Sequence, residues 1–152
     1  MIAGRLSLDV SYAARRPWVP SPQQFQVCVA AALADVAPPA QLSIRVVGAA
    51  RSRRLNAQYR HKDRATNVLS FAGAGRSPDG RIFLGELVIC APVVAREAER
   101  QRKAPLAHWA HMTVHGVLHL LGYDHERPVE ARKMSLIEIQ ILDRLGISNP
   151  YA

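Results

Sequence analysis

Aromatic residues and cysteines are both scarce in this sequence. Aromatic residues make up only 6% of the 152 residues, so aliphatic side chains must fill most of the interior. The two cysteines, Cys28 and Cys90, lie far apart in apolar runs. We therefore predict that both are buried as small hydrophobic side chains and that they do not form a disulfide.

Long apolar runs are missing as well. No run approaches the roughly 20 apolar residues that a membrane span requires. Residues 1–16, MIAGRLSLDVSYAARR, lack the apolar core of a signal peptide. We therefore expect a cytoplasmic protein that has no membrane partner and whose thiols stay reduced.

Acidic residues are outnumbered by basic ones. There are 20 lysines and arginines against 12 aspartates and glutamates, which gives a net charge of +8. Such an excess indicates a polyanionic partner, usually RNA, DNA or a membrane surface. The alternative is that the charge only keeps the protein in solution.

The hydrophobic content of 49% is enough for one core, which excludes a disordered chain. The length suits one domain, residues 1–152. Alternating and 3.6-residue apolar patterns, with proline and glycine at the breaks, predict an α+β fold. In it, a small four-stranded mixed sheet packs with about five helices. The expected strands are 6–10, 42–47, 66–71 and 81–90, and the expected helices are 22–36, 50–60, 93–103, 105–121 and 129–145.

The segment HGVLHLLGYDH, residues 115–125, carries three histidines at the spacing of a metal site. His115 and His119 share one face of a helix, and Gly122 can end that helix in the left-handed conformation. His125 would then return toward the same ion. Three imidazoles fill three corners of the tetrahedron that zinc prefers and leave the fourth open, which is typical of a catalytic site. Nickel and copper would also accept three imidazoles.

Four other residues lie near these histidines in the sequence: His108, His111, Gly116 and Asp124. We expect His111 either to contact the site from behind its ligands or to lie on the surface, and His108 to lie on the surface. Asp124 either orients a ligand, His125 or His119, or caps the turn. The pattern H-x-x-x-H-x-x-G-x-x-H matches that of zinc proteases except at Gly116, where those enzymes have a glutamate that serves as general base. The sequence keeps the metal site and lacks the peptidase base.

A second group of residues is basic. The stretch RSRRLNAQYRHKDRATNVLSF, residues 51–71, is dense in arginine and runs into a predicted core strand. This density favours a phosphate-binding groove over a solvated helix face, and the fork of an arginine can donate two parallel hydrogen bonds to a phosphate. The candidate RNA-binding residues are Arg51, Arg53, Arg54, Lys62 and Arg64.

Three blocks, YRHKDRATNVLSF, LGELVIC and HGVLHLLGYDH, occur in this order and together resemble the YbeY family of bacterial endoribonucleases and rRNA maturation factors. The histidine block matches at every characteristic position. Ala72 departs from the pattern, because a proline often follows the SF pair. The resemblance implies a zincin-like metal helix. It also implies a zinc-dependent, single-strand-specific endoribonuclease that matures the 3′ end of small-subunit rRNA and acts in ribosome quality control.

The resemblance also implies roles for individual residues. One zinc ion per chain would be held by His115, His119 and His125, and the arginine of the family's YR pair corresponds to Arg60. Arg60 and His115 are thus the expected catalytic residues, with Arg60 stabilising charge on the phosphate. The expected partners are single-stranded RNA, an rRNA precursor, and the ribosome or its small-subunit assembly factors. One rival is a non-catalytic ribosome-assembly protein with structural zinc. A metallopeptidase is a weaker rival, because Gly116 argues against it.

Overall fold

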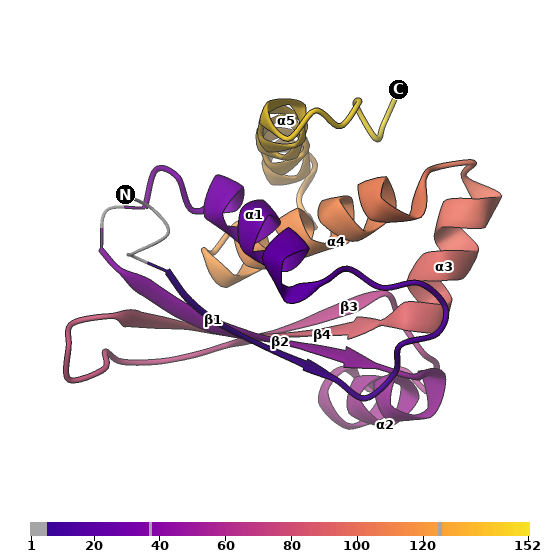
Figure 1. Cartoon of the computed structure of the whole chain (residues 1–152), viewed down its shortest axis with the longest axis horizontal. Helices are drawn as coiled ribbons and strands as arrows, with labels where there is room; N and C mark the ends of the chain where they lie inside the picture. Colours follow the sequence, from indigo (N-terminus) through magenta and orange to yellow (C-terminus); the bar gives the residue numbers. More distant parts are fainter. Residues whose placement is uncertain (1–5, 37, 125) are drawn as a thin grey trace.

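The computed structural model describes residues 6–36, 38–124 and 126–152. Strands and helices are mixed along the chain (Figure 1), as the sequence predicts. The elements are β1 (Leu6–Tyr12), α1 (Pro22–Ala32), β2 (Ala40–Val47), α2 (Ala49–Arg60), β3 (Val68–Ala72), β4 (Ile82–Cys90), α3 (Ala91–Arg100), α4 (Pro105–Leu120) and α5 (Pro128–Arg144).

The four strands form one mixed sheet in the order β1-β2-β4-β3. β1 pairs with β2 in parallel, and β2 pairs with β4 in parallel. β3 is antiparallel to β4 and occupies the edge of the sheet. The predicted α+β fold with a four-stranded mixed sheet is therefore confirmed.

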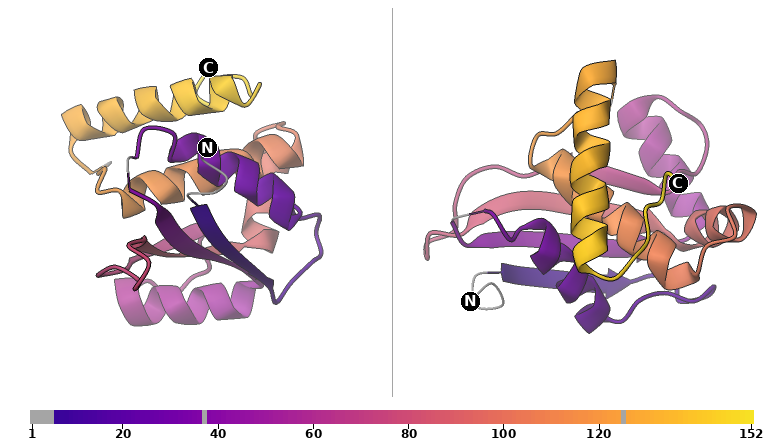
Figure 2. Two further views of the ribbon diagram at one scale, coloured as in Figure 1. Left: turned by 60° about the vertical axis from the view of Figure 1, so that its left-hand side comes forward. Right: turned by 90° about the horizontal axis from the view of Figure 1, so that it is seen from above.

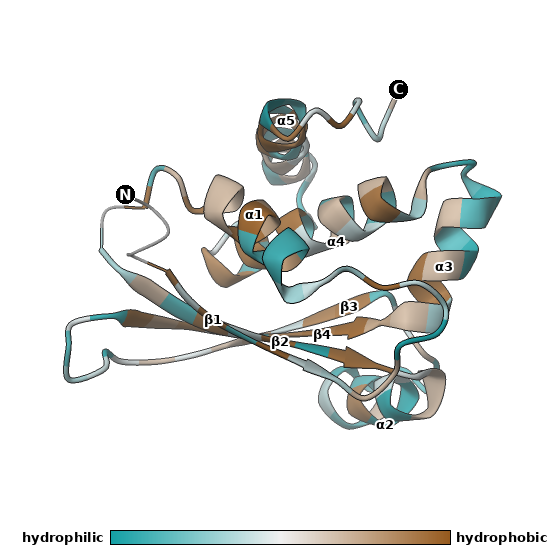
Figure 3. Cartoon of the chain, viewed as in Figure 1, coloured by the Kyte–Doolittle hydropathy of each residue, from teal (hydrophilic) through white to brown (hydrophobic). Residues whose placement is uncertain are grey.

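The helices cover the two faces of the sheet unequally. Figure 1 shows α1 and α4 on one face and α2 on the other, and α5 lies beyond α4 as seen from the sheet. Figure 2 shows α5 crossing over α4. In Figure 3, hydrophobic residues concentrate in the sheet and in α1 and α4, while α2 is largely hydrophilic. The larger core therefore lies between the sheet, α1 and α4.

Buried aliphatic side chains dominate this core, as the low aromatic content predicts. The central strand β4 contributes to both faces: Leu87 and Ile89 belong to the larger cluster, and Val88 belongs to the smaller cluster beneath α2. Cys28 and Cys90 are both buried and free, which confirms their predicted role as small hydrophobic side chains.

α1 begins where the sequence predicts and ends earlier. The Ser21 side chain accepts a hydrogen bond from the Gln24 amide, Gln24 reciprocates, and Pro22 occupies the first turn. The expected end near residue 36 is wrong, because the chain tightens after Ala32 into turns. The amide of Val36 donates to the Leu33 carbonyl at 3.0 Å, so backbone groups left unpaired at the helix end find partners there.

α4 is buried along most of its length between the sheet and α5. The indole of Trp109 is 1% exposed and meets the Phe25 ring edge-on, with 5.9 Å between ring centroids. Val114, Val117 and Leu118 are also buried. Apolar contacts on two sides therefore fix the helix that carries the histidines. Within the described parts of the chain, no helix is both long and apolar enough to cross a membrane.

Candidate functional site

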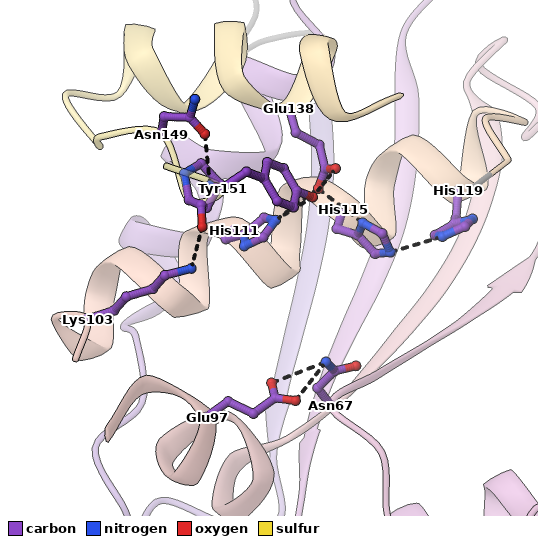
Figure 4. A network of polar contacts seen from close by, with 10 residues as sticks. Asn67, Glu97, Lys103, His111, His115, His119, Glu138, Asn149 and Tyr151 are labelled. Carbon is purple, nitrogen blue, oxygen red and sulfur yellow. Dashed lines mark hydrogen bonds and ion pairs between the residues drawn. The ribbon is translucent and has the colours of Figure 1, made fainter. Parts of the chain in front are cut away.

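His115 and His119 lie one turn apart on α4, and their rings meet edge-on (Figure 4). Their Nε2 atoms are 3.0 Å apart. Two imidazole nitrogens bound to one tetrahedral zinc at about 2.0–2.1 Å lie roughly 3.4 Å apart. The observed separation is that of a hydrogen bond between the two nitrogens and is somewhat shorter than the zinc value, so the two nitrogens lie close enough together to become ligands of one cation. The structure thus brings together two of the three predicted metal ligands.

His125, the third predicted ligand, lies outside the described residues. Among the residues that the structure does describe, no group of three or more His, Cys, Asp or Glu is placed to hold a metal ion. The turn that leads toward residue 125 has the predicted form: Gly122 has a φ of +99°, and the Tyr123 amide donates to the Leu118 carbonyl at 3.0 Å. Three-histidine coordination therefore remains a prediction.

Glu138, on α5, fixes the ring of His115. Its carboxylate is 1% exposed, and its Oε2 atom lies 3.0 Å from Nδ1 of His115. A carboxylate can only accept a hydrogen bond, so we assign the proton to Nδ1 of His115. The lone pair of Nε2 then points toward His119. This is the arrangement in which a carboxylate orients a metal-binding histidine.

Glu138 receives two further hydrogen bonds. Nε2 of His111 lies 3.1 Å from Oε2, and the hydroxyl of Tyr151 donates to Oε1 at 2.7 Å. Burial by itself would raise the pKa of Glu138, but hydrogen bonds from His111 and His115 outweigh it and lower the pKa to about 2. Burial and the adjacent Glu138 carboxylate raise the pKa of Tyr151. Glu138 is therefore an ionised carboxylate, and the phenol of Tyr151 that donates to its Oε1 atom is neutral.

Sequence reasoning did not identify Glu138, although a signal exists. Met134, Glu138, Ile141 and Leu142 form the buried face of α5. A glutamate at a position where the helical period requires an apolar side chain implies a partner, because a buried charge is costly unless it is paired. The identity of that partner depends on how α5 packs on α4, which the sequence does not specify.

The other two histidines of α4, His108 and His111, are both buried. His111 is buried and shares Glu138 with His115, which is the first of its two predicted alternatives. The expectation for His108 is wrong. It is 2% exposed, and its Nε2 lies 2.9 Å from Oε1 of Glu97, because α3 packs against this part of α4 and supplies the carboxylate.

Asp124 caps the turn after α4. Its Oδ1 atom accepts a hydrogen bond from the amide of Glu126 at 2.8 Å, as an Asx turn does. Of the two predicted roles for Asp124, this is the one for which the structure records a contact. The orientation of His115 comes from Glu138.

Gly116 leaves no room for the glutamate of a zinc protease. A Cβ atom added there would lie 2.8 Å from Cδ2 of the buried Leu87 and 3.3 Å from Cγ2 of Val68. The carbonyl of Gly116 also accepts a hydrogen bond from the Ser70 hydroxyl at 3.3 Å. Position 116 therefore faces the sheet, so a side chain at this position would not point toward the histidine pair.

The arginine-rich stretch forms α2 and the loop that follows it. The five predicted RNA-binding residues are all exposed, but Arg53 is already paired. Its Nε and Nη2 atoms donate to the two carboxylate oxygens of Asp63 at 2.7 and 2.9 Å, and this hydrogen bonding lowers the pKa of Asp63. The side chain of Asn56 donates to the Arg64 carbonyl at 2.9 Å, which fastens the loop to α2.

Arg60 is exposed in the last turn of α2, on the face of the sheet opposite α4 (Figure 1). Strand β3 contacts both helices. The Phe71 ring meets Tyr59 edge-on, with 5.1 Å between centroids, while Ser70 bonds to Gly116 of α4. The chain segments that carry Arg60 and the histidines are thus linked through one edge strand. An approach of the Arg60 side chain to the metal stays a prediction.

Comparison with known proteins decides the family. The model of the family described as Endoribonuclease YbeY matches residues 21–146, which include α4 and the arginine-rich stretch. This chain belongs to the YbeY family. Two relatives from Stenotrophomonas maltophilia, strains R551-3 and K279a, are each named endoribonuclease YbeY. Each is 54% identical to this chain, over 97% of this chain and 94% of the relative.

The fold has a counterpart among solved structures. The solution structure of TM1509 from Thermotoga maritima superimposes with a TM-score of 0.59 over 91% of each chain. The two sequences are 19% identical, so this likeness concerns the fold alone. Membership in the YbeY family, in contrast, rests on the family model and the close relatives and places this chain among the RNA-cleaving hydrolases.

Proposed function

We propose that this chain is a zinc-dependent, single-strand-specific endoribonuclease that acts in rRNA maturation, at the 3′ end of small-subunit rRNA, and in ribosome quality control. One observation carries the metal-dependent part of the proposal. The Nε2 atoms of His115 and His119 lie 3.0 Å apart, and a buried carboxylate on Glu138 holds the first of the two rings. Endoribonuclease activity follows from the family.

The residues present suit zinc. His115 and His119 would hold the ion together with the predicted ligand His125, and bound zinc would supply a Lewis acid for a phosphate oxygen. Glu138 keeps the His115 ring in one tautomer and orientation. Arg60 would bind the phosphate of the scissile bond through its guanidinium, which stays charged and can donate two hydrogen bonds at once.

The proposed substrate is single-stranded RNA within an rRNA precursor. The net charge of +8 and the exposed residues Arg51, Arg54, Lys62 and Arg64 support a polyanionic ligand. The ribosome or small-subunit assembly factors are the proposed macromolecular partners, and the cytoplasm is the proposed location.

RNA cleavage by the metal-analysed chain tests this proposal. A labelled single-stranded RNA and a duplex of the same sequence are incubated with the chain, with and without a chelator. We expect cleavage of the single strand only, loss of cleavage with the chelator, and recovery when zinc is added. His119→Ala removes one ligand and should abolish both zinc binding and cleavage. Cleavage that survives complete removal of metal would contradict the proposal.

The rival with purely structural zinc makes a different prediction about folding. α4 is fixed by apolar contacts to α1 and the sheet through Trp109, Val117 and Leu118, so its position does not require a metal. Hence metal removal should leave the fold intact and abolish cleavage. The peptidase rival is opposed by Gly116, where the general base of that class has no space.

A further inference from the structure

We propose that Tyr151 is a positioning residue of the metal site, because its hydroxyl fixes the carboxylate that in turn fixes His115. The proposal rests on the proposed function in one respect: the site that Tyr151 supports is the zinc site. The residue lies in the segment that follows α5, far in sequence from the histidines. It acts on His115 through Glu138, whose carboxylate contacts both residues.

The two oxygens of Glu138 have different donors. Oε2 accepts hydrogen bonds from two imidazoles, that of His115 at 3.0 Å and that of His111 at 3.1 Å. Oε1 accepts a hydrogen bond from the hydroxyl of Tyr151 at 2.7 Å. A carboxylate that rotates about its terminal bond would exchange these two oxygens. Donors on both oxygens hold it in one orientation, and that orientation sets the direction of Nδ1 of His115.

The segment that carries Tyr151 is itself held in place. The Tyr151 amide donates to Oδ1 of Asn149 at 2.8 Å, and Nζ of Lys103 donates to the Pro150 carbonyl at 3.1 Å. The Tyr151 ring also stands edge-on to the His111 ring, with 5.4 Å between centroids. Figure 4 shows Asn149 and Lys103 on one side of Tyr151 and Glu138 on the other.

Tyr151 is far more exposed than the carboxylate that its hydroxyl contacts. The residue as a whole is 53% exposed, while Glu138, which its hydroxyl contacts, is 1% exposed. A residue that is half exposed contributes little to the core. The hydroxyl, however, satisfies a charged oxygen that is removed from water, where a missing partner is costly. Loss of the hydroxyl should therefore cost some stability and should also free the carboxylate that orients His115.

The test compares two variants that each remove one phenolic hydroxyl. Tyr151→Phe removes the donor to Glu138. Tyr12→Phe is the matched control, because the Tyr12 hydroxyl donates to the Pro20 carbonyl at 2.6 Å in another part of the fold. The zinc Kd is measured by competition with a chromogenic chelator. Thermal melting of the metal-free chains reports the effect on the fold.

We expect Tyr151→Phe to raise the zinc Kd about tenfold, at the lower end of the range for outer partners of metal ligands. Tyr12→Phe should leave the Kd unchanged. Both variants should stay folded at the temperature of the zinc titration, which the melting curves check, so a change in Kd is not a consequence of unfolding. A Kd in Tyr151→Phe equal to that of the unmodified chain would overturn the proposal, and so would an equal rise of the Kd in both variants.

A second measurement needs no metal. It therefore tests the positioning role of Tyr151 even if the proposed zinc-dependent function is wrong. Nitrogen-15 NMR of the histidine rings in the metal-free chain reports which ring nitrogen of His115 carries the proton. We expect the proton on Nδ1 in the unmodified chain and in Tyr12→Phe, and a mixture of tautomers in Tyr151→Phe. If the unmodified chain binds no zinc, the zinc-dependent function fails, and unchanged ring signals in Tyr151→Phe would then overturn the positioning role as well.

Discussion

Gly116 has no space for a side chain, although it lies inside a helix where alanine is intrinsically preferred by about 1 kcal/mol. A Cβ at this position would meet both methyl groups of Leu87, at 2.8 and 3.1 Å, and Leu87 is fully buried. Overpacking of this kind costs roughly 1–3 kcal/mol. The steric cost should therefore exceed the gain in helix propensity.

We predict that Gly116→Ala lowers the free energy of unfolding by about 1 kcal/mol, as measured by urea denaturation. Gly48→Ser is the control, because a Cβ at Gly48 meets nothing within 4 Å and a serine can cap the start of α2. The control should be neutral or stabilising. A Gly116→Ala chain more stable than the unmodified one would show that α4 does not pack against the sheet as described.

Arg60 should be needed for chemistry and not for folding. It is exposed at the end of α2, and a guanidinium cannot bind a metal because it has no lone pair to give. We predict that Arg60→Ala keeps its zinc and its melting temperature but cleaves RNA about 100-fold more slowly, as expected when a charge-stabilising donor is lost. Arg60→Lys should recover only part of the rate.

Arg132 offers a matched control for this variant. It is an exposed arginine on α5, which lies on the other side of the sheet from α2 (Figure 1). Arg132→Ala should cleave RNA at close to the normal rate. Normal cleavage by a folded, zinc-loaded Arg60→Ala chain would return Arg60 to the role of a solvated arginine at a helix end.

At the scale of elements, a chain of polar contacts joins α3, α4 and Asn67, the residue just before β3. Nδ2 of Asn67 donates to the carboxylate of Glu97 at 3.1 and 3.2 Å, and Nε2 of His108 lies 2.9 Å from the same group. Burial by itself would raise the pKa of Glu97. Hydrogen bonds from His108 and Asn67 outweigh this effect, so the pKa is lower than its usual value of 4.5.

The sign of the resulting pH dependence follows from the lowered pKa. A carboxylate whose pKa is lower in the folded state stabilises the fold above about pH 4.5, and this contribution is lost as the pH falls through the folded-state pKa. We predict that Glu97→Gln lowers stability at pH 7 by about 1.5 kcal/mol. Its stability should then decline less than that of the unmodified chain between neutral pH and about pH 3.

Urea denaturation at several pH values measures this difference. Glu99→Gln is the control, since Glu99 is exposed on the same helix two residues away, and it should follow the unmodified chain. Parallel stability curves for Glu97→Gln and Glu99→Gln would contradict a stabilising role for the Glu97 contacts.

Sequence patterns predicted the elements far better than the contacts between them. Apolar period, the Ser21 cap and the proline positions placed every helix and strand within a few residues, because these signals are local. The histidine pair was predictable for the same reason, since a spacing of four on a helix fixes a shared face. Glu97 and Glu138 were not, because each meets its histidine only through packing between helices. His108 was misplaced on the surface for that reason.

At the scale of the whole molecule, charge should govern the strength of RNA binding. The chain carries a net charge of +8, and binding through phosphates releases counterions, so affinity should fall as salt rises. Each phosphate contact with a single strand contributes about 0.7 to the slope of log K against log salt. We predict that Arg54→Ala reduces this slope by about that amount.

Arg53→Ala provides an internal comparison. The guanidinium of Arg53 is already paired with Asp63, so its removal should change the slope less than the removal of Arg54 does. Filter binding or fluorescence anisotropy with a single-stranded RNA across a salt series measures both slopes. Affinity that does not vary with salt would argue against a groove that holds RNA through its phosphates.

The central claim is that His115 and His119 of α4 hold a zinc ion that is required for RNA cleavage. The fold itself does not require the zinc ion. Titration of the metal-free chain with zinc tests this claim, with RNA cleavage and far-ultraviolet circular dichroism followed on the same samples. We predict that cleavage rises from background and saturates at one zinc per chain while the dichroism stays constant. Cleavage at full rate before zinc is added, or dichroism that reaches its folded value only with zinc, would contradict the account.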